Sequence, residues 1–500
     1  MKKYTKNILV LLLGIITVSC SDNFLEDNID PNNPTAVSPN LVLPVAQSYS
    51  AGLIHDENSD TNNNQSFRRL NTLGNLLMVN WSQSDGFSWY DDEFNYTVNP
   101  SFYSGIWDDS YIKPLQNYKV LTGLTEEYSN YNAIAKIMMS YHFQILVDTY
   151  GDVPYFQALE RSNNPTPAYD DAQVIYEDLI VKLDEAIDLI KNADAATVVP
   201  GADDVMFQGD MTSWIKFANT IKLRILVRQS GMASRAAYVQ TNMDNIVAEG
   251  SGFITDDVVV NPGYINVEFK RNPFYNSFGL TIAGATQNNG EATCASDYII
   301  NYLINTNDSR INSLYTEPAT GHLGVPQGLL NYPEDNSFEP QFVSKLGPGI
   351  LSSPTQDAPL FQVAEALFLQ AEAVQRGFMT GNAKALYEDA ITASFNYLGA
   401  GDATFYFTQP GMVNVNWDDS PNKIQAIITQ KWVALNGTNG HESWVEYNRT
   451  GYPSGLPVPL NNTNADRPVR LAYPSSEITG NTANVPTQPN VFTQKIFWAN

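Results

Sequence analysis

The sequence contains little cysteine: only Cys20 and Cys294 occur among its 500 residues. Two cysteines allow at most one disulfide, so the fold cannot depend on a disulfide framework of the kind that small exported domains use. We predict that Cys294 is a small packed residue in the interior. The stability of this chain must therefore come from a large apolar core, for which its length is ample.

Basic residues are also scarce. The chain has 28 Lys and Arg against 53 Asp and Glu, which gives a formal net charge of −25 at pH 7. Such a chain repels phosphate backbones, so we expect no nucleic-acid partner. It also gains no electrostatic attraction to anionic lipid surfaces, so any residence at a membrane must have another origin.

Long apolar runs are absent beyond the N-terminus. The run over residues 8–16 follows three lysines and precedes small residues, a pattern typical of a secretory signal. It is too short to cross a bilayer, which takes roughly 20 residues. We predict a signal peptide over residues 1–19.

Cys20 directly follows this segment, in the order Thr17-Val18-Ser19-Cys20. The pattern resembles a bacterial lipobox, in which the cysteine is acylated and becomes the new N-terminus, although Thr17 stands where that motif has an aliphatic residue. A lipidated Cys20 would attach the protein to a membrane without a spanning helix. The alternative is an ordinary secreted protein with a cysteine here by chance. Residues 20–40 are acidic and rich in Asn and Pro, which predicts an extended tether.

Helical periodicity dominates residues 41–500. In 171–192, for example, apolar residues recur at steps of three and four, and Asp171 precedes them as a helix cap. The expected helices are 41–54, 66–80, 103–121, 127–149, 171–192, 212–230, 233–249, 296–305, 359–377, 382–398 and 421–436. Long irregular stretches between them hold most of the Gly, Pro and Asn, and so much loop indicates loops with a function. We interpret residues 41–500 as one mostly α body.

Motifs of the common enzyme classes are missing. The sequence has no GxSxG, no Rossmann GxGxxG, no P-loop and no HExxH, and its four histidines lack metal-ligand spacing. We therefore predict no catalytic residues, no metal and no cofactor. Acid pairs such as Asp108-Asp109 are expected to be caps or solvated loop residues. A glycoside hydrolase, which needs two opposed carboxyls, remains a less favoured hypothesis.

One loop segment is unusually aromatic. Residues 81–90 hold Trp81, Phe87, Trp89 and Tyr90, interleaved with Ser, Gln and Asp. Aromatic faces stack on the C–H faces of sugars while polar groups bind hydroxyls, so these residues are candidates for a carbohydrate site. The alternative is a loop pinned to the core by its aromatics, and it suits Trp81 best because Trp81 directly follows an apolar helix. Tyr275, in a second aromatic segment, is a weaker candidate.

Several blocks of the sequence, in order, carry a family signature. They are Asp148-Thr-Tyr-Gly-Asp-Val-Pro-Tyr155, Gly209-Asp-Met-Thr-Ser-Trp214, Glu365-Ala-Leu-Phe-Leu-Gln-Ala-Glu372, Gln430-Lys-Trp432, Arg449-Thr-Gly-Tyr-Pro453 and Arg470-Leu-Ala-Tyr-Pro474. This series resembles the SusD/RagB (SusD-like) family of nutrient-binding outer-membrane lipoproteins of Bacteroidetes type. The resemblance spans about residues 40–500.

The resemblance implies a tetratricopeptide-like helical superhelix with long loops and minor β elements. It also implies a lipid-anchored protein on the outer membrane, facing the cell exterior, that binds an oligosaccharide and acts as a lid on a SusC-like TonB-dependent transporter. The same scaffold could instead capture peptides. A family signature of this kind describes the fold and the partner, and it leaves the ligand open.

Overall fold

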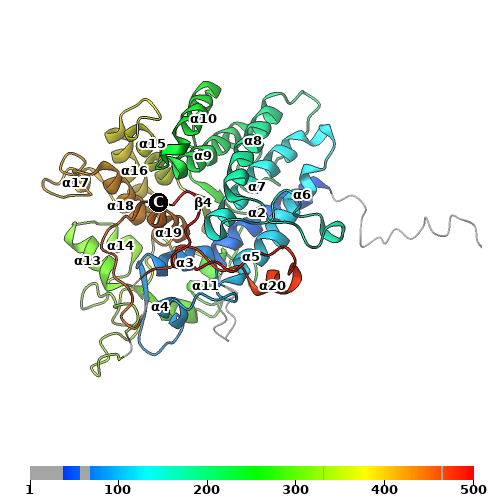
Figure 1. Ribbon diagram of the computed structural model, residues 1–500. Coiled ribbons are helices and arrows are strands. Elements are labelled where there is room, and N and C mark those ends of the chain that lie inside the picture. Colours follow the sequence, from blue (N-terminus) through cyan, green and yellow to red (C-terminus); the bar gives the residue numbers. More distant parts are fainter. Residues whose placement is uncertain (1–37, 57–67, 330, 463–465, 500) are drawn as a thin grey trace, which may run out of the picture.

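The computed structural model describes residues 38–56, 68–329, 331–462 and 466–499 (Figure 1). The predicted signal peptide over 1–19, the lipidation at Cys20 and most of the tether over 20–40 lie outside these residues and stay predictions. The first described helix begins at Pro39, two residues inside the predicted tether. Among the described residues, no helix combines the length and apolarity that a membrane span requires.

Helices form the frame of the structure. Their bounds are α2 Pro39–His55, α3 Leu70–Leu77, α6 Gln116–Thr122, α7 Ser129–Tyr150, α8 Ala172–Lys191, α9 Met211–Gln229, α10 Ala236–Glu249, α13 Asp297–Asn305, α15 Val363–Gln375, α16 Ala383–Leu398, α18 Lys423–Ala434 and α19 Gly440–Thr450. Helices consecutive in sequence pack on one another from α6 through α10, and α15 packs on α16. Because α9 also packs on α15, the helical array continues across the long insertion between α10 and α15.

Short elements lie within the loops. The short helices are α4 Asp91–Asn95, α5 Ser104–Ser110, α11 Pro273–Phe278, α12 Asn288–Ala292, α14 Ile311–Leu314, α17 Thr404–Phe407 and α20 Ser475–Gly480, with a π-helical turn η3 Tyr111–Leu115 and 3-10 turns η4 Glu126–Tyr128, η5 Arg161–Asn163 and η6 Ala233–Arg235. Strand β1 (Trp81–Gln83) pairs antiparallel with β3 (Thr293–Ala295), and β2 (Val258–Val260) pairs antiparallel with β4 (Ala358–Phe361). This helical superhelix with minor β elements confirms the predicted fold class.

Two expectations for the helices differ from the structure. The expected helix 103–121 is confirmed as a continuous helical run through α5, η3 and α6, with a π-helical turn at η3, where Pro114 has no backbone N–H for the regular helical bond. The expected helix 359–377 starts as strand β4, since pairing with β2 overrides the local helical pattern. Helix α19 was not predicted from periodicity because polar residues such as His441 and Glu446 occupy its buried face.

Local interactions define the helix ends, and the predicted cap at Asp171 is confirmed. The Asp171 carboxylate accepts hydrogen bonds from the N–H groups of Gln173 (2.9 Å) and Val174 (3.0 Å), which caps α8. Gly151 ends α7 with φ +80°, a conformation that a residue with a Cβ rarely adopts. Asp170, by contrast, accepts from the N–H groups of Tyr155 and Phe156 and so closes the turn that follows α7.

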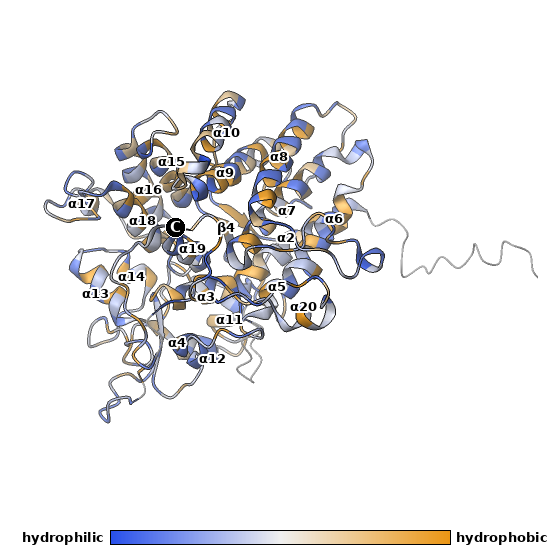
Figure 2. Ribbon diagram, in the orientation of Figure 1, coloured by the Kyte–Doolittle hydropathy of each residue, from blue (hydrophilic) through white to orange (hydrophobic). Residues whose placement is uncertain are grey.

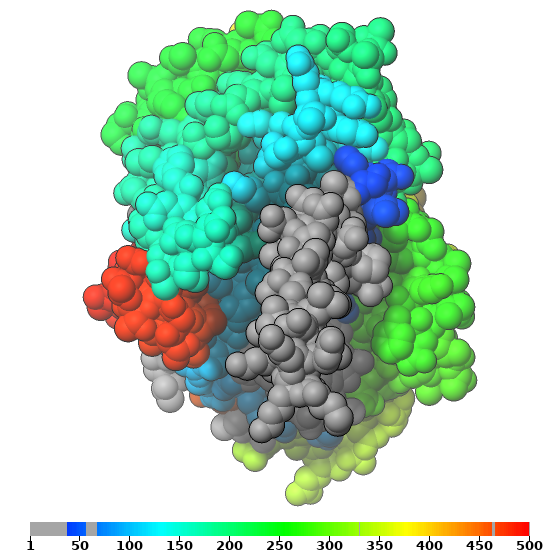
Figure 3. All heavy atoms as spheres, turned by 90° about the vertical axis from the view of Figure 1, so that its right-hand side faces the viewer, coloured from blue at the N-terminus to red at the C-terminus, as the bar shows by residue number. Residues whose placement is uncertain are grey.

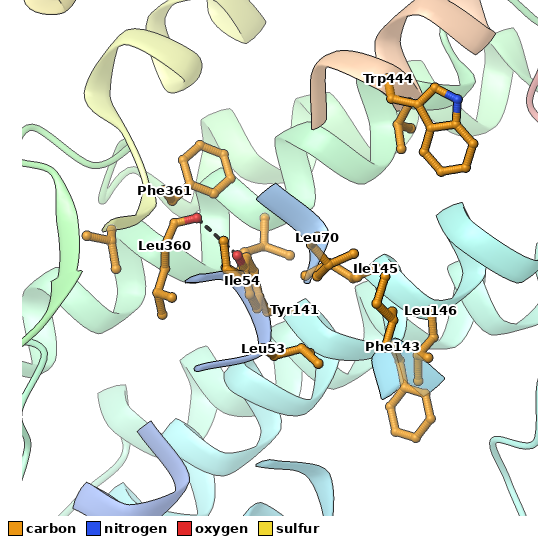
Figure 4. Close-up of a cluster of buried hydrophobic side chains, with 14 of the residues drawn as sticks. Leu53, Ile54, Leu70, Tyr141, Phe143, Ile145, Leu146, Leu360, Phe361 and Trp444 are labelled. Carbon is orange, nitrogen blue, oxygen red and sulfur yellow. Dashed lines mark hydrogen bonds between the residues drawn. The ribbon is translucent and has the colours of Figure 1, made fainter. Parts of the chain in front are cut away.

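The core forms where α2, α7, β4 and α19 meet. Figure 4 shows Leu53 and Ile54 beside Tyr141, whose hydroxyl donates to the Leu360 carbonyl over 3.0 Å. The helices around this core carry both hydrophobic and hydrophilic residues (Figure 2), as amphipathic helices with one buried face do. Cys294 is fully buried, as predicted.

Candidate functional site

The aromatic loop is built on strand β1 and folds back over it. The side chain of Gln83, the last residue of β1, accepts hydrogen bonds from the N–H groups of Trp89 (2.5 Å) and Tyr90 (3.0 Å). Its amide nitrogen donates to the carbonyl of Phe87 (2.5 Å). One buried side chain therefore holds the backbone of the whole turn in place.

Trp81 and Tyr90 belong to the core. Trp81 is 0% exposed and lies between Phe274 (ring centroids 6.3 Å apart, stacked) and Phe278 (5.6 Å, edge-on). Tyr90 is 2% exposed, and its hydroxyl is 2.6 Å from that of Thr293 on β3. Neither ring presents a free face to a ligand in this structure. Their aromatic character serves the attachment of the loop to the core.

Trp89 is placed differently. Its side chain is half-buried, and its indole Nε1 donates to the Asn289 side-chain oxygen over 2.7 Å. Phe87 lies edge-on to the indole at 5.6 Å between ring centroids, and both Gly86 and Ser88 are exposed. The indole is thus fixed in orientation at the surface, beside exposed polar residues. Such a preorganised aromatic can stack on a ring without losing much rotamer freedom.

Tyr275, on α11, is also half-buried. The guanidinium of Arg271 lies over its ring, 4.9 Å from the centroid. Since this cation covers one face, Tyr275 offers at most its other face and its hydroxyl to a ligand.

Residues far apart in sequence complete the surface around Trp89. Asn289 lies on α12, and the Tyr332 hydroxyl donates to the carbonyl of Gln83 over 3.2 Å. Near them Lys345 and Glu291 form an ion pair of 2.8 Å, and the Lys345 segment bridges to β3. We define the Trp89 surface as Phe87, Trp89 and Asn289 with their exposed neighbours. The sequence could not single out Asn289, because nothing in its own segment marks it.

The Trp89 surface has no obvious groups for chemistry other than binding. Within the described residues, no three His, Cys, Asp or Glu side chains come together in a way that could hold a metal ion. His142 is buried in the core, and its Nε2 is 2.8 Å from the Ser50 hydroxyl. Burial lowers the pKa of His142 to about 3, so this imidazole is neutral at physiological pH.

Comparison with known proteins places the chain in a family. The family model described as "Starch-binding associating with outer membrane" (SusD-like) matches residues 44–474. The chain therefore belongs to the SusD-like family, as its sequence motifs indicate. No curated protein matches the chain.

Solved structures share the fold. A chitin-binding SusD homologue from Flavobacterium johnsoniae is 23% identical with a TM-score of 0.75, and the match covers 91% of this chain and 98% of that one. A SusD homologue from Bacteroides uniformis is 24% identical with a TM-score of 0.72, covering 92% of this chain and 99% of that one. At this level of identity the likeness describes the architecture and leaves the ligand undecided.

Proposed function

We propose that this protein is a surface-exposed, lipid-anchored binding protein that captures an oligosaccharide and delivers it, as a lid, to a SusC-like TonB-dependent transporter. The observation that carries the proposal is Trp89: a half-buried indole, held by Asn289 and Phe87, in a loop rich in polar groups. The family description, with its association of starch binding and the outer membrane, supports the same function. The role requires binding only, and no covalent step.

Chitin oligosaccharides are the first ligands to test, because a relative of the same fold is described as chitin-binding. Affinity electrophoresis in gels containing soluble glycans would measure retardation of the wild-type protein and of Trp89→Ala. We expect Trp89→Ala to weaken binding at least about tenfold, the equivalent of about 1.4 kcal/mol. Its thermal stability should stay close to that of the wild type.

Phe405→Ala is the matched control. Phe405 on α17 is 75% exposed and lies outside the Trp89 surface, so its loss should not change glycan retardation. Equal retardation of Trp89→Ala and wild type would contradict the proposed site. A large fall in the stability of Trp89→Ala would show instead that this indole is a core residue.

Calorimetry with peptide libraries would test the alternative function, a peptide-capturing protein on the same scaffold.

The transporter partnership needs a separate test. Affinity purification of the tagged protein from detergent-solubilised outer membranes should bring down a TonB-dependent transporter in stoichiometric amount. Recovery of the protein without such a partner would contradict the lid function while leaving glycan binding intact.

A further inference from the structure

A cavity shares no lining residue with the Trp89 surface. It is a cavity of about 470 Å³ between α5, the loop after α7 and α20, within the range of about 300–1,000 Å³ typical of small-molecule sites. Figure 3 shows α20 in red beside the teal segment that follows α7. The Tyr169 hydroxyl donates to Glu477 over 2.8 Å and the Asn481 amide to the Pro167 carbonyl over 2.8 Å, so the two walls are joined.

The floor of the cavity is apolar and rigid. Tyr111, which is half-buried, and Ile112, which is 65% exposed, line it, and Tyr111 is supported by the buried ring of Trp107 with 5.3 Å between ring centroids. Trp107 also stacks on Tyr169 at 6.0 Å, and the Tyr111 hydroxyl donates to the Pro154 carbonyl over 2.7 Å. A ligand with an apolar part would find a preformed surface here.

Charged groups of both signs surround this floor. Asp108 on α5 and Glu477 on α20 each use one carboxylate oxygen internally, accepting from Ser476 (2.6 Å) and Tyr169 (2.8 Å) respectively. Over the part of the chain that the structure describes, the other oxygen of each carboxylate has no hydrogen-bond partner, and the Arg161 guanidinium has no acidic partner. Partial burial raises the pKa of Asp108, as expected where water has limited access.

The loop wall holds an unusual backbone. Leu159 (φ +68°) and Arg161 (φ +52°) both adopt the left-handed conformation, which residues with a Cβ rarely do. Pro165 and Pro167 follow in the same wall and restrict its motion. Strained residues that the surrounding structure holds in place cluster at ligand clamps and active sites, so this loop has the character of a preformed binding wall.

We propose that this cavity binds a small zwitterion, an amino acid with an apolar side chain. Its ammonium group meets Asp108 and Glu477, its carboxylate meets Arg161, and its side chain lies on the floor formed by Tyr111 and Ile112. A simple amine would leave the guanidinium without a partner, and a simple acid would leave both carboxylates without one. Only a ligand with both charges pairs all three groups.

Three probes of similar shape test this assignment by calorimetry: L-phenylalanine, phenethylamine, which lacks the carboxylate, and 3-phenylpropionate, which lacks the amine. We expect L-phenylalanine to bind at least tenfold more tightly than either of the others. Absence of L-phenylalanine binding at millimolar concentration, or equal binding of all three probes, would overturn the proposal.

Substitutions then test which side chain binds each charged group of the ligand. Arg161→Gln should weaken L-phenylalanine binding at least tenfold and leave phenethylamine binding unchanged, whereas Asp108→Asn combined with Glu477→Gln should abolish both. Arg161 is exposed, so its replacement should leave the fold intact. If Arg161→Gln weakened phenethylamine as much as L-phenylalanine, the guanidinium would not be the carboxylate partner and the assignment would fail.

The two sites can be separated experimentally. Trp89→Ala should leave L-phenylalanine binding unchanged, and Arg161→Gln should leave glycan retardation unchanged. Failure of the zwitterion site would therefore not affect the proposed glycan function, and the reverse also holds.

Discussion

The Arg449 guanidinium on α19 binds the Glu372 carboxylate on α15 through two parallel hydrogen bonds, each 2.7 Å long, and both side chains are buried. Burial alone would raise the pKa of Glu372, but Arg449 outweighs it and lowers that pKa to about 2. The same arginine also pairs with Glu446. Paired charges of this kind join helices that lie far apart in sequence.

Removing the charge of Glu372 should therefore destabilise the protein strongly. Glu372→Gln keeps the size of the side chain but leaves Arg449 buried beside a neutral amide, at an expected cost of about 3 kcal/mol in the free energy of unfolding. Urea denaturation would measure it. The control is Lys384→Gln, which removes an exposed ion pair with Asp418 and should cause no measurable loss. Equal stability of Glu372→Gln and wild type would show that the pair contributes nothing.

Two glycines allow α3 and α19 to cross in close contact. A Cβ added at Gly74 would lie 1.9 Å from the carbonyl carbon of Gly440, far inside van der Waals contact. Gly74→Ala must push the helices apart, and we expect a loss of at least about 3 kcal/mol or failure to fold. Gly52→Ala, in α2, is the control: its nearest neighbour would be the Asp56 Cβ at 3.8 Å, so helix propensity should yield a gain of about 0.5–1 kcal/mol. Thermal denaturation of both variants would measure these changes in stability. A Gly74→Ala protein as stable as the wild type would contradict the close crossing of α3 and α19.

His142 should make stability depend on pH. Burial lowers the pKa of His142 to about 3, below its ordinary value near 6.5. Below pH 6.5 the unfolded chain therefore takes up a proton that the folded chain does not, and stability falls as the pH falls towards 3. The loss is about 1.4 kcal/mol per pH unit.

The comparison of wild type with His142→Gln isolates this effect from other titrating groups. Denaturant titrations between pH 7.5 and pH 4 should show the wild type losing stability more steeply than the variant. His322→Gln is the control, because His322 is only half-buried and should change the slope less. Parallel profiles for wild type and His142→Gln would mean that His142 is not held neutral by the fold.

The predicted lipid anchor can be tested directly. Cys20→Ser should move the protein from the membrane fraction to the soluble exported fraction, because no other acylation site is predicted. Cys294→Ser, at a buried cysteine, should leave the protein with the membrane. Retention of Cys20→Ser at the membrane would favour attachment through a protein partner instead.

Helices were largely predictable because their signals are local. The cap at Asp171 and the left-handed residue at Gly151 lie within a few residues of the ends that they define. Where a distant segment intervenes, the local pattern misleads, as in strand β4, which owes its conformation to pairing with β2 about 100 residues earlier. Helix α19 was not predicted because its buried face is polar. Its buried Glu446 pairs with Arg228 and Lys431 on other helices.

The positions of the side chains in the aromatic loop could not be predicted from the sequence. Trp81, Trp89 and Tyr90 share one ten-residue segment, yet two of them are core residues and one is at the surface. Their different exposures depend on β3, α11 and α12, about 200 residues later in the chain. The cavity between α5 and α20 likewise combines three segments that are distant in the sequence.

Amino-acid order alone was sufficient to establish the helical class, the scarcity of disulfides and the family of this protein, since amphipathic spacing, composition and motifs are properties of neighbouring residues. Only the tertiary structure determined which aromatic face meets water, which carboxylates are buried in ion pairs, and which of them line a cavity. The reason is physical: burial and pairing depend on the approach of segments that are distant in the chain, and no local period records that approach.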